Sequence, residues 1–201
     1  MSLKKINTLI VGGGQAGLAM SEHLSNNEVP HLILERKRIV ERWRTSRWDS
    51  LVANGPAWHD RFPTMKFSGV LPDAFAHKDC VVTYFEDFAK KIKAPIRCNV
   101  NVKQVMKLPN KAGFSVTTSE GVIEAKNVVV ATGPFQQPVI PPLVPRDSGI
   151  EQIHSKNYHN PKQLPNGAVL VVGAGSSVIS DLYEAGTYYG NPAKLQPQNK
   201  S

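Results

Sequence analysis

The hydrophobic pattern divides the start of the chain into three short elements. Residues 6–11 form an apolar run that ends in a group of glycines, and residues 15–26 carry apolar side chains at helical spacing. Pro30 separates this segment from a second apolar run at residues 31–34. A strand, a tight turn, a helix and a second strand are typical of a βαβ unit. The pattern therefore predicts two parallel strands joined by a helix.

The pattern changes character further along the chain. Residues 81–92 carry apolar side chains at helical spacing, and Pro95 ends that predicted helix. Residues 96–105, 113–118 and 122–130 are expected to be strands. Turn residues at 110–113 and 120–121 separate them. Consecutive strands joined by short turns form a β-meander, which we expect to be attached to the parallel sheet.

Residues 40–80 lack a clean periodicity and are rich in aromatic residues, prolines and glycines. A long irregular segment inside a compact domain is usually a functional loop region. We therefore expect this stretch to contribute a loop region beside a binding site.

The glycines between the first strand and the first helix indicate a binding function. Gly12, Gly14 and Gly17 follow the Gly-x-Gly-x-x-Gly spacing of dinucleotide-binding turns. In such a turn the first glycine makes the tight bend, the second lets the backbone contact a pyrophosphate, and the third lets the helix pack on the strand. The helix N-terminus, at Gln15 and Ala16, offers free N–H groups and a positive dipole end to the phosphates.

An acidic residue after the second strand completes this motif. Glu35 lies eighteen residues after Gly17, close to the spacing of about 20 residues at which a carboxylate takes the ribose hydroxyls. A second strand–turn–helix pattern begins at residue 169 and contains Gly173 and Gly175. The sequence thus predicts an α/β fold, with a Rossmann-like FAD/NAD(P)-binding domain, a parallel sheet, a β-meander and an incomplete second Rossmann unit.

Composition and charge exclude several classes of protein. The chain has 201 residues and 41% hydrophobic content, and no apolar run approaches the ~20 residues needed to cross a membrane. The net charge of +8 is scattered, without a nucleic-acid-binding signature. Cys80 and Cys98 lack a CxxC pairing, which argues for reduced thiols, a cytoplasmic location and no zinc site or redox disulfide. We expect no metal, no nucleic-acid partner, no membrane span and no signal peptide.

Taken in order, these motifs resemble those of two-dinucleotide-binding-domain flavoproteins, and within them the flavin-containing monooxygenase group. Residues 131–133, Ala-Thr-Gly after a buried strand, fit that order. Residues 43–51 are similar to the family's tryptophan-containing segment beside the flavin, and residues 133–141 to its glycine with two spaced prolines. Residues 149–158 resemble the identifying motif of the group, although Asp147 stands where phenylalanine is expected and Gly149 is one residue too far from the histidine.

The resemblance implies the cofactors and the reaction. In that family FAD lies on the first glycine motif, NADPH reduces it from the second, and the flavin then reacts with oxygen to oxygenate a small organic substrate. Asn54 resembles the asparagine that some members use near the flavin; a turn residue before Gly55-Pro56 is the alternative interpretation. The cofactor-binding residues implied are Gly12, Gly14, Gln15, Ala16, Gly17, Glu35, Arg36, Trp43, Val102, Ala131, Thr132, Gly133, Gly173, Gly175, Ser176 and Ser177.

The second nucleotide unit is expected to be incomplete. Val178 stands at the third small position, where a β-branched side chain would push the helix from the strand. About 30 residues of this second unit are present, where a nucleotide domain needs on the order of 100. We expect residues 1–165 to form the FAD-binding domain, with residues 40–80 as its aromatic loop region. Residues 166–201 are expected to be a fragment of an NADPH-binding domain.

Three functions remain open at this stage. The first is a monooxygenase-type flavoenzyme, for which we expect little or no NADPH-driven turnover from this chain alone. The second is an FAD-dependent reductase without oxygenation, and the third is a non-catalytic or FAD-binding remnant. A thioredoxin-reductase-like chemistry is disfavoured because paired cysteines are absent. Unfinished sheet edges favour association, so a homo-oligomer is a further expectation.

Overall fold

The computed structural model describes residues 4–109, 111–134, 137–142, 145 and 147–171, together with the backbone of two short strands near the C-terminus. The chain folds into two compact units, Met1–Pro161 and Lys162–Ser201. The second unit contains the antiparallel pair β7 (Tyr188–Tyr189) and β8 (Lys194–Leu195). The 3₁₀ turn η1 (Pro161–Gln163) lies where the first unit ends.

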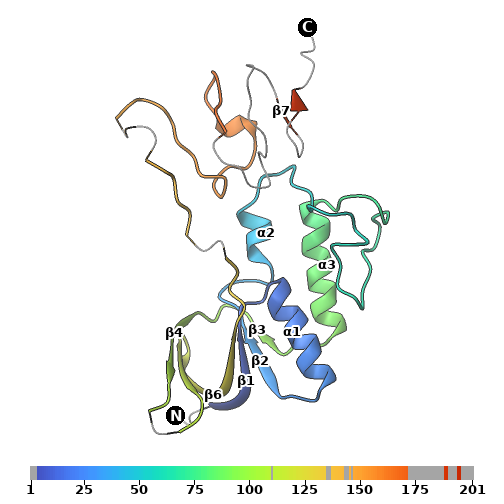
Figure 1. Cartoon of the computed structure of the whole chain (residues 1–201), viewed down its shortest axis with the longest axis vertical. Coiled ribbons are helices and arrows are strands. Elements are labelled where there is room, and N and C mark those ends of the chain that lie inside the picture. Colours follow the sequence, from blue (N-terminus) through green and yellow to red (C-terminus); the bar gives the residue numbers. More distant parts are fainter. Residues whose placement is uncertain are drawn as a thin grey trace. The chain divides into compact units, whose positions relative to one another are not determined.

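A six-stranded sheet forms the base of the first unit (Figure 1). Its strand order is β3-β2-β1-β6-β5-β4. The central strand β1 runs parallel to β2 and β6, and β2 runs parallel to β3. Strands β4, β5 and β6 form the antiparallel β-meander, so the predicted α/β fold is confirmed. The strands are β1 (Lys4–Val11), β2 (His31–Leu34), β3 (Ile96–Arg97), β4 (Val102–Lys107), β5 (Phe114–Thr118) and β6 (Gly121–Val130).

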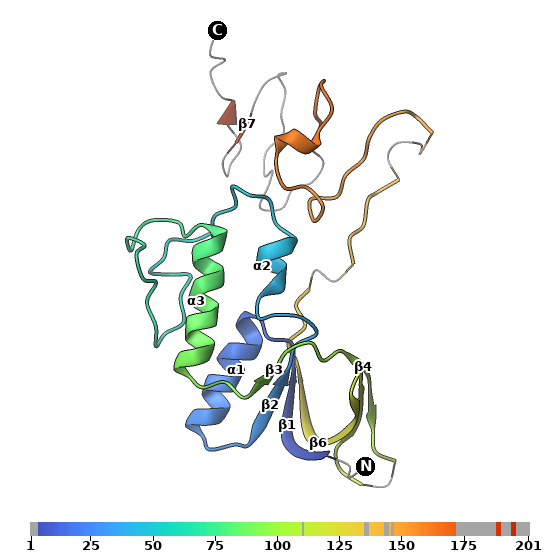
Figure 2. The ribbon, with the colours of Figure 1, turned by 180° about the vertical axis from the view of Figure 1, so that it is seen from behind.

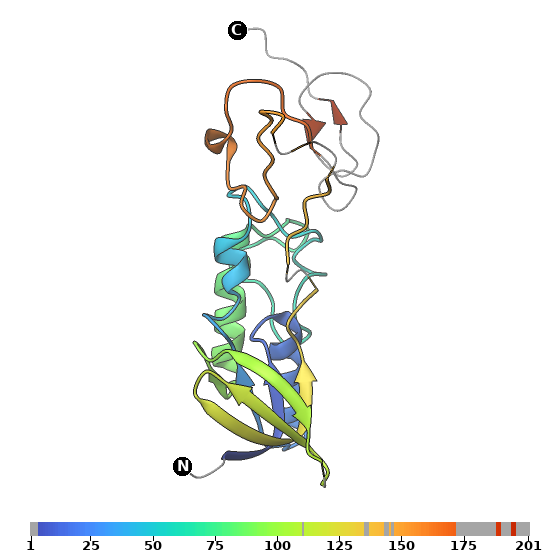
Figure 3. The same ribbon diagram turned by 90° about the vertical axis from the view of Figure 1, so that its left-hand side faces the viewer.

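Helices and the meander cover opposite faces of the parallel strands. The helices α1 (Gln15–Asn26) and α3 (Lys78–Lys91) lie side by side on one face, as Figures 1 and 2 show. Ile10, Leu18 and Phe88 belong to the apolar cluster on that side. On the other face Leu9 and Val116 belong to a second cluster, beneath the meander (Figure 3). Both faces are thereby buried, as a parallel sheet requires.

The predicted strand at residues 96–105 is wrong in one respect, because the structure divides it into β3 and β4. The chain bends between them, and Asn99 adopts a positive φ of 63°. Val100 donates its N–H to the carbonyl of Glu35 and is buried against the meander side of the sheet. Two separate pairing partners, β2 and β5, therefore take the two ends of one continuous apolar run.

The predicted helix at residues 81–92 begins three residues earlier, as α3. The ring nitrogen of His77 accepts a hydrogen bond from the N–H of Asp79 at 3.3 Å, which caps the first turn. The irregular region at residues 40–80 contains the short helix α2 (Glu41–Thr45) and a single bridge between Val52 and His77.

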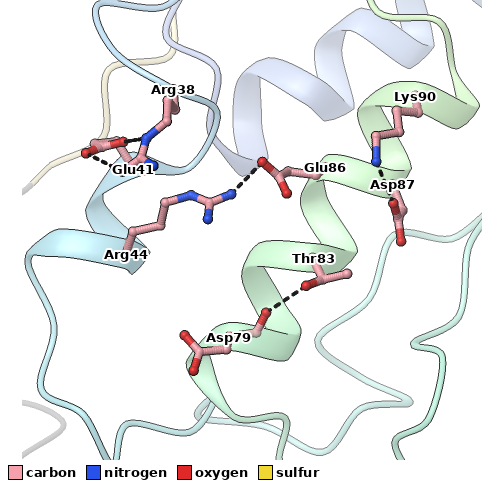
Figure 4. A network of polar contacts seen from close by, with 8 residues as sticks. All are labelled: Arg38, Glu41, Arg44, Asp79, Thr83, Glu86, Asp87 and Lys90. Atoms are coloured by element: carbon pink, nitrogen blue, oxygen red, sulfur yellow. Dashed lines mark hydrogen bonds and ion pairs between the residues drawn. The ribbon is translucent and has the colours of Figure 1, made fainter.

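One ion pair joins α2 to α3, and a second lies at the start of α2. The guanidinium of Arg44 on α2 contacts the carboxylate of Glu86 on α3 at 2.5 Å, and Arg38 pairs with Glu41 at 2.7 Å (Figure 4). Among the described residues, the Nε of Arg44 is buried without a hydrogen-bond partner. Because one end of this contact is only half-buried, its effect is to set the direction of α2 more than to add stability.

Aromatic packing orders the irregular segment that follows. The ring of Phe62 stacks on Phe88 at 3.7 Å and lies edge-on to Phe85 at 5.4 Å. The hydroxyl of Tyr84 accepts a hydrogen bond from the N–H of Phe62 at 2.7 Å and donates one to the carbonyl of Met65 at 2.6 Å. Burial raises the pKa of this hydroxyl, which keeps it protonated as a donor. The loop is thus fixed to α3 without regular secondary structure.

We expect Tyr84→Phe to lower the free energy of unfolding by about 1–3 kcal/mol, because it leaves the buried N–H of Phe62 without its acceptor. Urea unfolding followed by circular dichroism measures this loss. Thr83→Ala is the matched control on the same helix, since the Thr83 hydroxyl bonds only the exposed Asp79 carbonyl. If Tyr84→Phe lowers the free energy of unfolding no more than this control, the Tyr84 hydroxyl does not fix the loop.

Candidate functional site

The glycine turn connects β1 to α1 through two close backbone approaches. Gly12 has a φ of +114°, and a Cβ atom there would lie 2.4 Å from the carbonyl oxygen of Ala131. A Cβ atom on Gly17 would lie 2.0 Å from the carbonyl oxygen of Gly12. At Gly14, by contrast, an added Cβ would meet no atom within 4 Å. Gly12 and Gly17 are therefore required by packing, whereas Gly14 leaves an open space in front of the turn.

The Glu35 carboxylate ties this turn to the end of β2. Its Oε2 accepts a hydrogen bond from the N–H of Gly13 at 2.8 Å, and its Oε1 accepts one from the N–H of Lys37 at 2.9 Å. A side chain 22 residues away thus holds the glycine turn. No side chain caps the N-terminus of α1, so its first N–H groups face the space beside Gly14.

A cavity of about 1120 Å³ opens at this turn. Its wall contains the C-terminal ends of β1, β2 and β6, the start of α1, α2 and the beginning of β4. Parallel strands of an open α/β sheet place their ligand sites at this edge. The cavity brings together these residues predicted to bind the cofactor: Gly12, Gly14, Gln15, Ala16, Glu35, Arg36, Trp43, Val102, Ala131, Thr132 and Gly133.

The other predicted residues lie elsewhere. Gly17 is not part of the wall and acts through the packing described above. Asn54 is exposed and is also not part of the wall, so its proposed role near a cofactor stays a prediction. The second glycine motif, with Gly173, Gly175, Ser176 and Ser177, lies outside the described residues.

The cavity wall contains basic side chains that the motif does not include. The guanidinium of Arg47 lies 5.8 Å from the centre of the Trp43 ring. Burial, and secondarily the charge of Arg42, lower the pKa of Arg47. Lys156 comes from the chain segment that follows the sheet. Arg47 and Lys156 lie in the segments at residues 43–51 and 149–158 that carry the family resemblance, but no local pattern marks either residue itself.

The segment after β6 returns to the wall and is fastened there. The N–H of Asp49 donates to the carbonyl of His159 at 2.7 Å, and the side-chain amide of Asn160 donates to the Asp49 carboxylate at 2.8 Å. The ammonium of Lys78, a nearly buried side chain, lies 3.2 Å from the same carboxylate. The hydrogen bond from Asn160, together with that from Lys78, lowers the pKa of the Asp49 carboxyl.

Among the described residues, the structure gives no support for a metal site, a disulfide or a membrane-spanning helix. Within those residues no group of three or more histidine, cysteine or acidic side chains is placed to hold a metal. Cys80 and Cys98 are both free thiols. The helices of the same residues are too short or too polar to cross a membrane.

The residues present fit a dinucleotide. An open cradle at Gly14, an uncapped helix N-terminus and a carboxylate beside them match the phosphates and ribose of such a ligand. The cavity volume is that of a site for a large ligand. Trp43 and Phe62 add an aromatic surface to the wall.

Comparison with known proteins places the chain among oxidoreductases. A family model described as pyridine nucleotide-disulphide oxidoreductase matches residues 9–188. An uncharacterized CzcO-like oxidoreductase of Geobacillus kaustophilus is 42% identical over 86% of this chain and 49% of that protein. The probable indole-3-pyruvate monooxygenase YUCCA1 of Arabidopsis thaliana is 31% identical over 84% of this chain and 42% of that protein. The chain spans about half the length of the curated relatives it matches.

A solved structure shows the same fold. A flavin monooxygenase of Stenotrophomonas maltophilia superimposes with a TM-score of 0.72 at 22% identity, over 80% of this chain and 48% of that one. At this identity the likeness concerns the fold.

The two glycines give a pair of opposite expectations for stability. Gly17→Ala places a methyl group against the Gly12 carbonyl and is expected to lower the free energy of unfolding by about 2 kcal/mol or more. Gly14→Ala meets open space at a φ of −94°, so we expect a change within about 0.5 kcal/mol. Thermal and urea unfolding of the two variants test this; equal losses would contradict the packing role of Gly17.

Proposed function

Because the chain belongs to the pyridine nucleotide-disulphide oxidoreductase family, we propose that it binds FAD in the cavity at the glycine turn, within an oxidoreductase of the flavin monooxygenase type. The observation that carries the proposal is the open cradle at Gly14, which lies between the uncapped N-terminus of α1 and the Glu35 carboxylate. Relatives named as oxidoreductase and monooxygenase support the type of reaction.

Each part of the cavity wall has a separate task in this proposal. The N–H groups at the start of α1, at Gln15 and Ala16, hold the diphosphate. Glu35 accepts from the ribose hydroxyls while its two backbone contacts keep the turn in place. Trp43 and Phe62 cover the ring end of the cavity and exclude water from it. Bound FAD supplies the electron-transfer and oxygen chemistry; the protein orients it.

The remaining parts of the activity extend this proposal. We place NADPH at the second glycine motif, with Gly173, Gly175, Ser176 and Ser177. Residues 1–165 then serve as the FAD-binding domain and residues 166–201 as part of the NADPH-binding domain. The substrate is a small organic molecule, and Asn54 is the candidate residue that contacts the reacting group. We place the protein in the cytoplasm and include self-association among its expected properties.

A second candidate function is an FAD-dependent NAD(P)H reductase that does not oxygenate. The departure that favours it is in the sequence at residues 147–158, where the identifying motif of the monooxygenase group is imperfect. The two candidates differ in their products: an oxygenase converts an organic substrate with NADPH and oxygen, whereas a reductase consumes NADPH without forming an oxygenated product.

We expect the purified chain to take up FAD and to turn yellow, and Gly14→Ala to weaken FAD binding at least about tenfold. The added methyl group occupies the space where the backbone contacts the diphosphate, while the fold stays intact. Flavin absorbance and quenching of FAD fluorescence during titration measure this.

Thr83→Ala, on the exposed side of α3, serves as the control and is expected to bind FAD like the natural chain. A folded natural chain that takes up no added FAD would overturn the proposed function. Equal FAD affinity of the natural chain and the Gly14→Ala variant would contradict the placement of the diphosphate at the glycine turn.

A further inference from the structure

Three large apolar side chains are exposed on the irregular segment between α2 and α3. Trp58, Leu71 and Phe75 are 56%, 77% and 52% exposed, and together they are called the apolar patch. None of the three lines the cavity at the glycine turn. Single exposed apolar side chains are ordinary on a protein surface, whereas a group of them that lies together marks a contact with another molecule.

Backbone hydrogen bonds hold the residues of the apolar patch together. The N–H of Ala57 donates to the carbonyl of Ala74 at 2.8 Å, and the N–H of Trp58 donates to the carbonyl of Pro72 at 3.0 Å. The carbonyl of Leu71 accepts from the N–H of Ala74 at 3.0 Å, which closes a tight turn. The two stretches of chain that carry the patch therefore lie side by side.

The side chains of these stretches are arranged with the small residues inward and the large ones outward. Ala57 and Ala76 are buried, and each is the direct neighbour of an exposed aromatic residue, Trp58 or Phe75. Successive side chains of an extended stretch point to opposite sides. Aromatic rings that served only stability would take the inward positions, because they bury the larger apolar area. The outward rings are therefore available for a contact with another molecule.

The segment behind the apolar patch is firmly packed on the rest of the first unit. Phe67 stacks on Tyr84 of α3 at 4.0 Å, and Val70, next to Leu71, packs against the apolar cluster on that side of the sheet. Figures 1 and 2 show this segment beside α3. A surface that is fixed in advance loses little conformational entropy when it binds.

Area and charge favour an anionic lipid surface over a second copy of the chain. The three side chains expose on the order of 400 Å², whereas a stable protein interface takes about 800 Å² from each partner. The net charge of +8 repels another copy and attracts an anionic surface. Two cations belong to the same segment: Arg61, whose Nε donates to the Trp58 carbonyl at 3.0 Å, and the exposed Lys66. Neither forms an ion pair within the described part of the chain.

We propose that the apolar patch binds an anionic lipid surface, with Trp58, Leu71 and Phe75 at the level of the headgroups and Arg61 and Lys66 beside the lipid phosphates. Aromatic rings suit the boundary between hydrocarbon and headgroups. Apolar insertion and electrostatic attraction are the two contributions on which peripheral binding depends. The chain lies on the surface in this arrangement and does not cross it. This inference goes beyond the proposed function and does not rest on it.

Cosedimentation of the full chain with lipid vesicles tests the proposal. Vesicles of phosphatidylcholine and phosphatidylserine in equal parts are expected to bind at least about tenfold tighter than vesicles of phosphatidylcholine alone. Trp58→Ala and Leu71→Ala should each weaken binding about fivefold or more. Met106→Ala on β4 is the matched control, because Met106 is also 56% exposed but lies on the meander, across the sheet from α3; it should have no effect.

Two charge changes with opposite expected signs separate local contact from net charge. Asp73 is exposed between Leu71 and Phe75, so Asp73→Asn should tighten binding to the anionic vesicles about threefold or more, because a repelled carboxylate is removed. Lys66→Gln should weaken it by a similar factor. Lys126→Gln, an exposed site on β6, makes the same change in net charge as Lys66→Gln and should change binding less than twofold.

A folded natural chain that binds neither kind of vesicle would overturn the proposal, as would equal losses in Trp58→Ala and Met106→Ala. A dimer in sedimentation velocity that Trp58→Ala dissociates, without vesicle binding, would assign the apolar patch to a second copy of the chain instead. Circular dichroism checks that each variant is folded. FAD titration keeps the two proposals distinct, because Leu71→Ala is expected to leave FAD affinity unchanged within about twofold. Vesicle binding without uptake of FAD would refute the proposed function alone.

Discussion

The close approach of α1 to the end of β1 is the constraint on which the rest of the first unit depends. With hydrogen in place of a side chain at Gly17, the helix starts directly against the carbonyl of Gly12. Gly12 in turn lies against the carbonyl of Ala131, where β6 ends. The backbones of β1, α1 and the end of β6 therefore lie in close contact. A side chain at Gly12 or Gly17 would separate them. Of the glycines in this turn, only Gly14 leaves room for an added Cβ atom, and it lines the cavity.

The irregular segment between α2 and α3 is ordered by side chains and not by a hydrogen-bonded ladder. Phe62 is held between the rings of α3 and by the hydroxyl of Tyr84. The pair Arg44–Glu86 sets α2 against α3 (Figure 4). This arrangement gives one stretch of chain two faces, one packed on the helix and one forming part of the cavity wall. Loops that carry function on a rigid scaffold are commonly built in this way.

Electrostatics separates the cavity wall into two regions. Near the glycine turn the positive end of α1 faces the single carboxylate of Glu35, a combination suited to phosphate and ribose. Past α2 the wall contains Arg47 and Lys156, which have no acidic partner among the described residues. Desolvation strengthens the attraction between such cations and a bound anion. The two regions can therefore select different parts of the bound molecules.

By itself the sequence determined the features that depend on neighbouring residues. The spacing of Gly12, Gly14 and Gly17, the position of Glu35 and the order of strands and helices are local patterns, because the geometry of one turn and one helix fixes them. The tertiary structure decided what depends on contacts between distant segments. It divided residues 96–105 between two strands, because two partners compete for one apolar run. It also brought Lys156 to the same cavity wall as Arg47. The contact between Asn160 and Asp49 joins the two segments across more than a hundred residues, for which no local pattern exists.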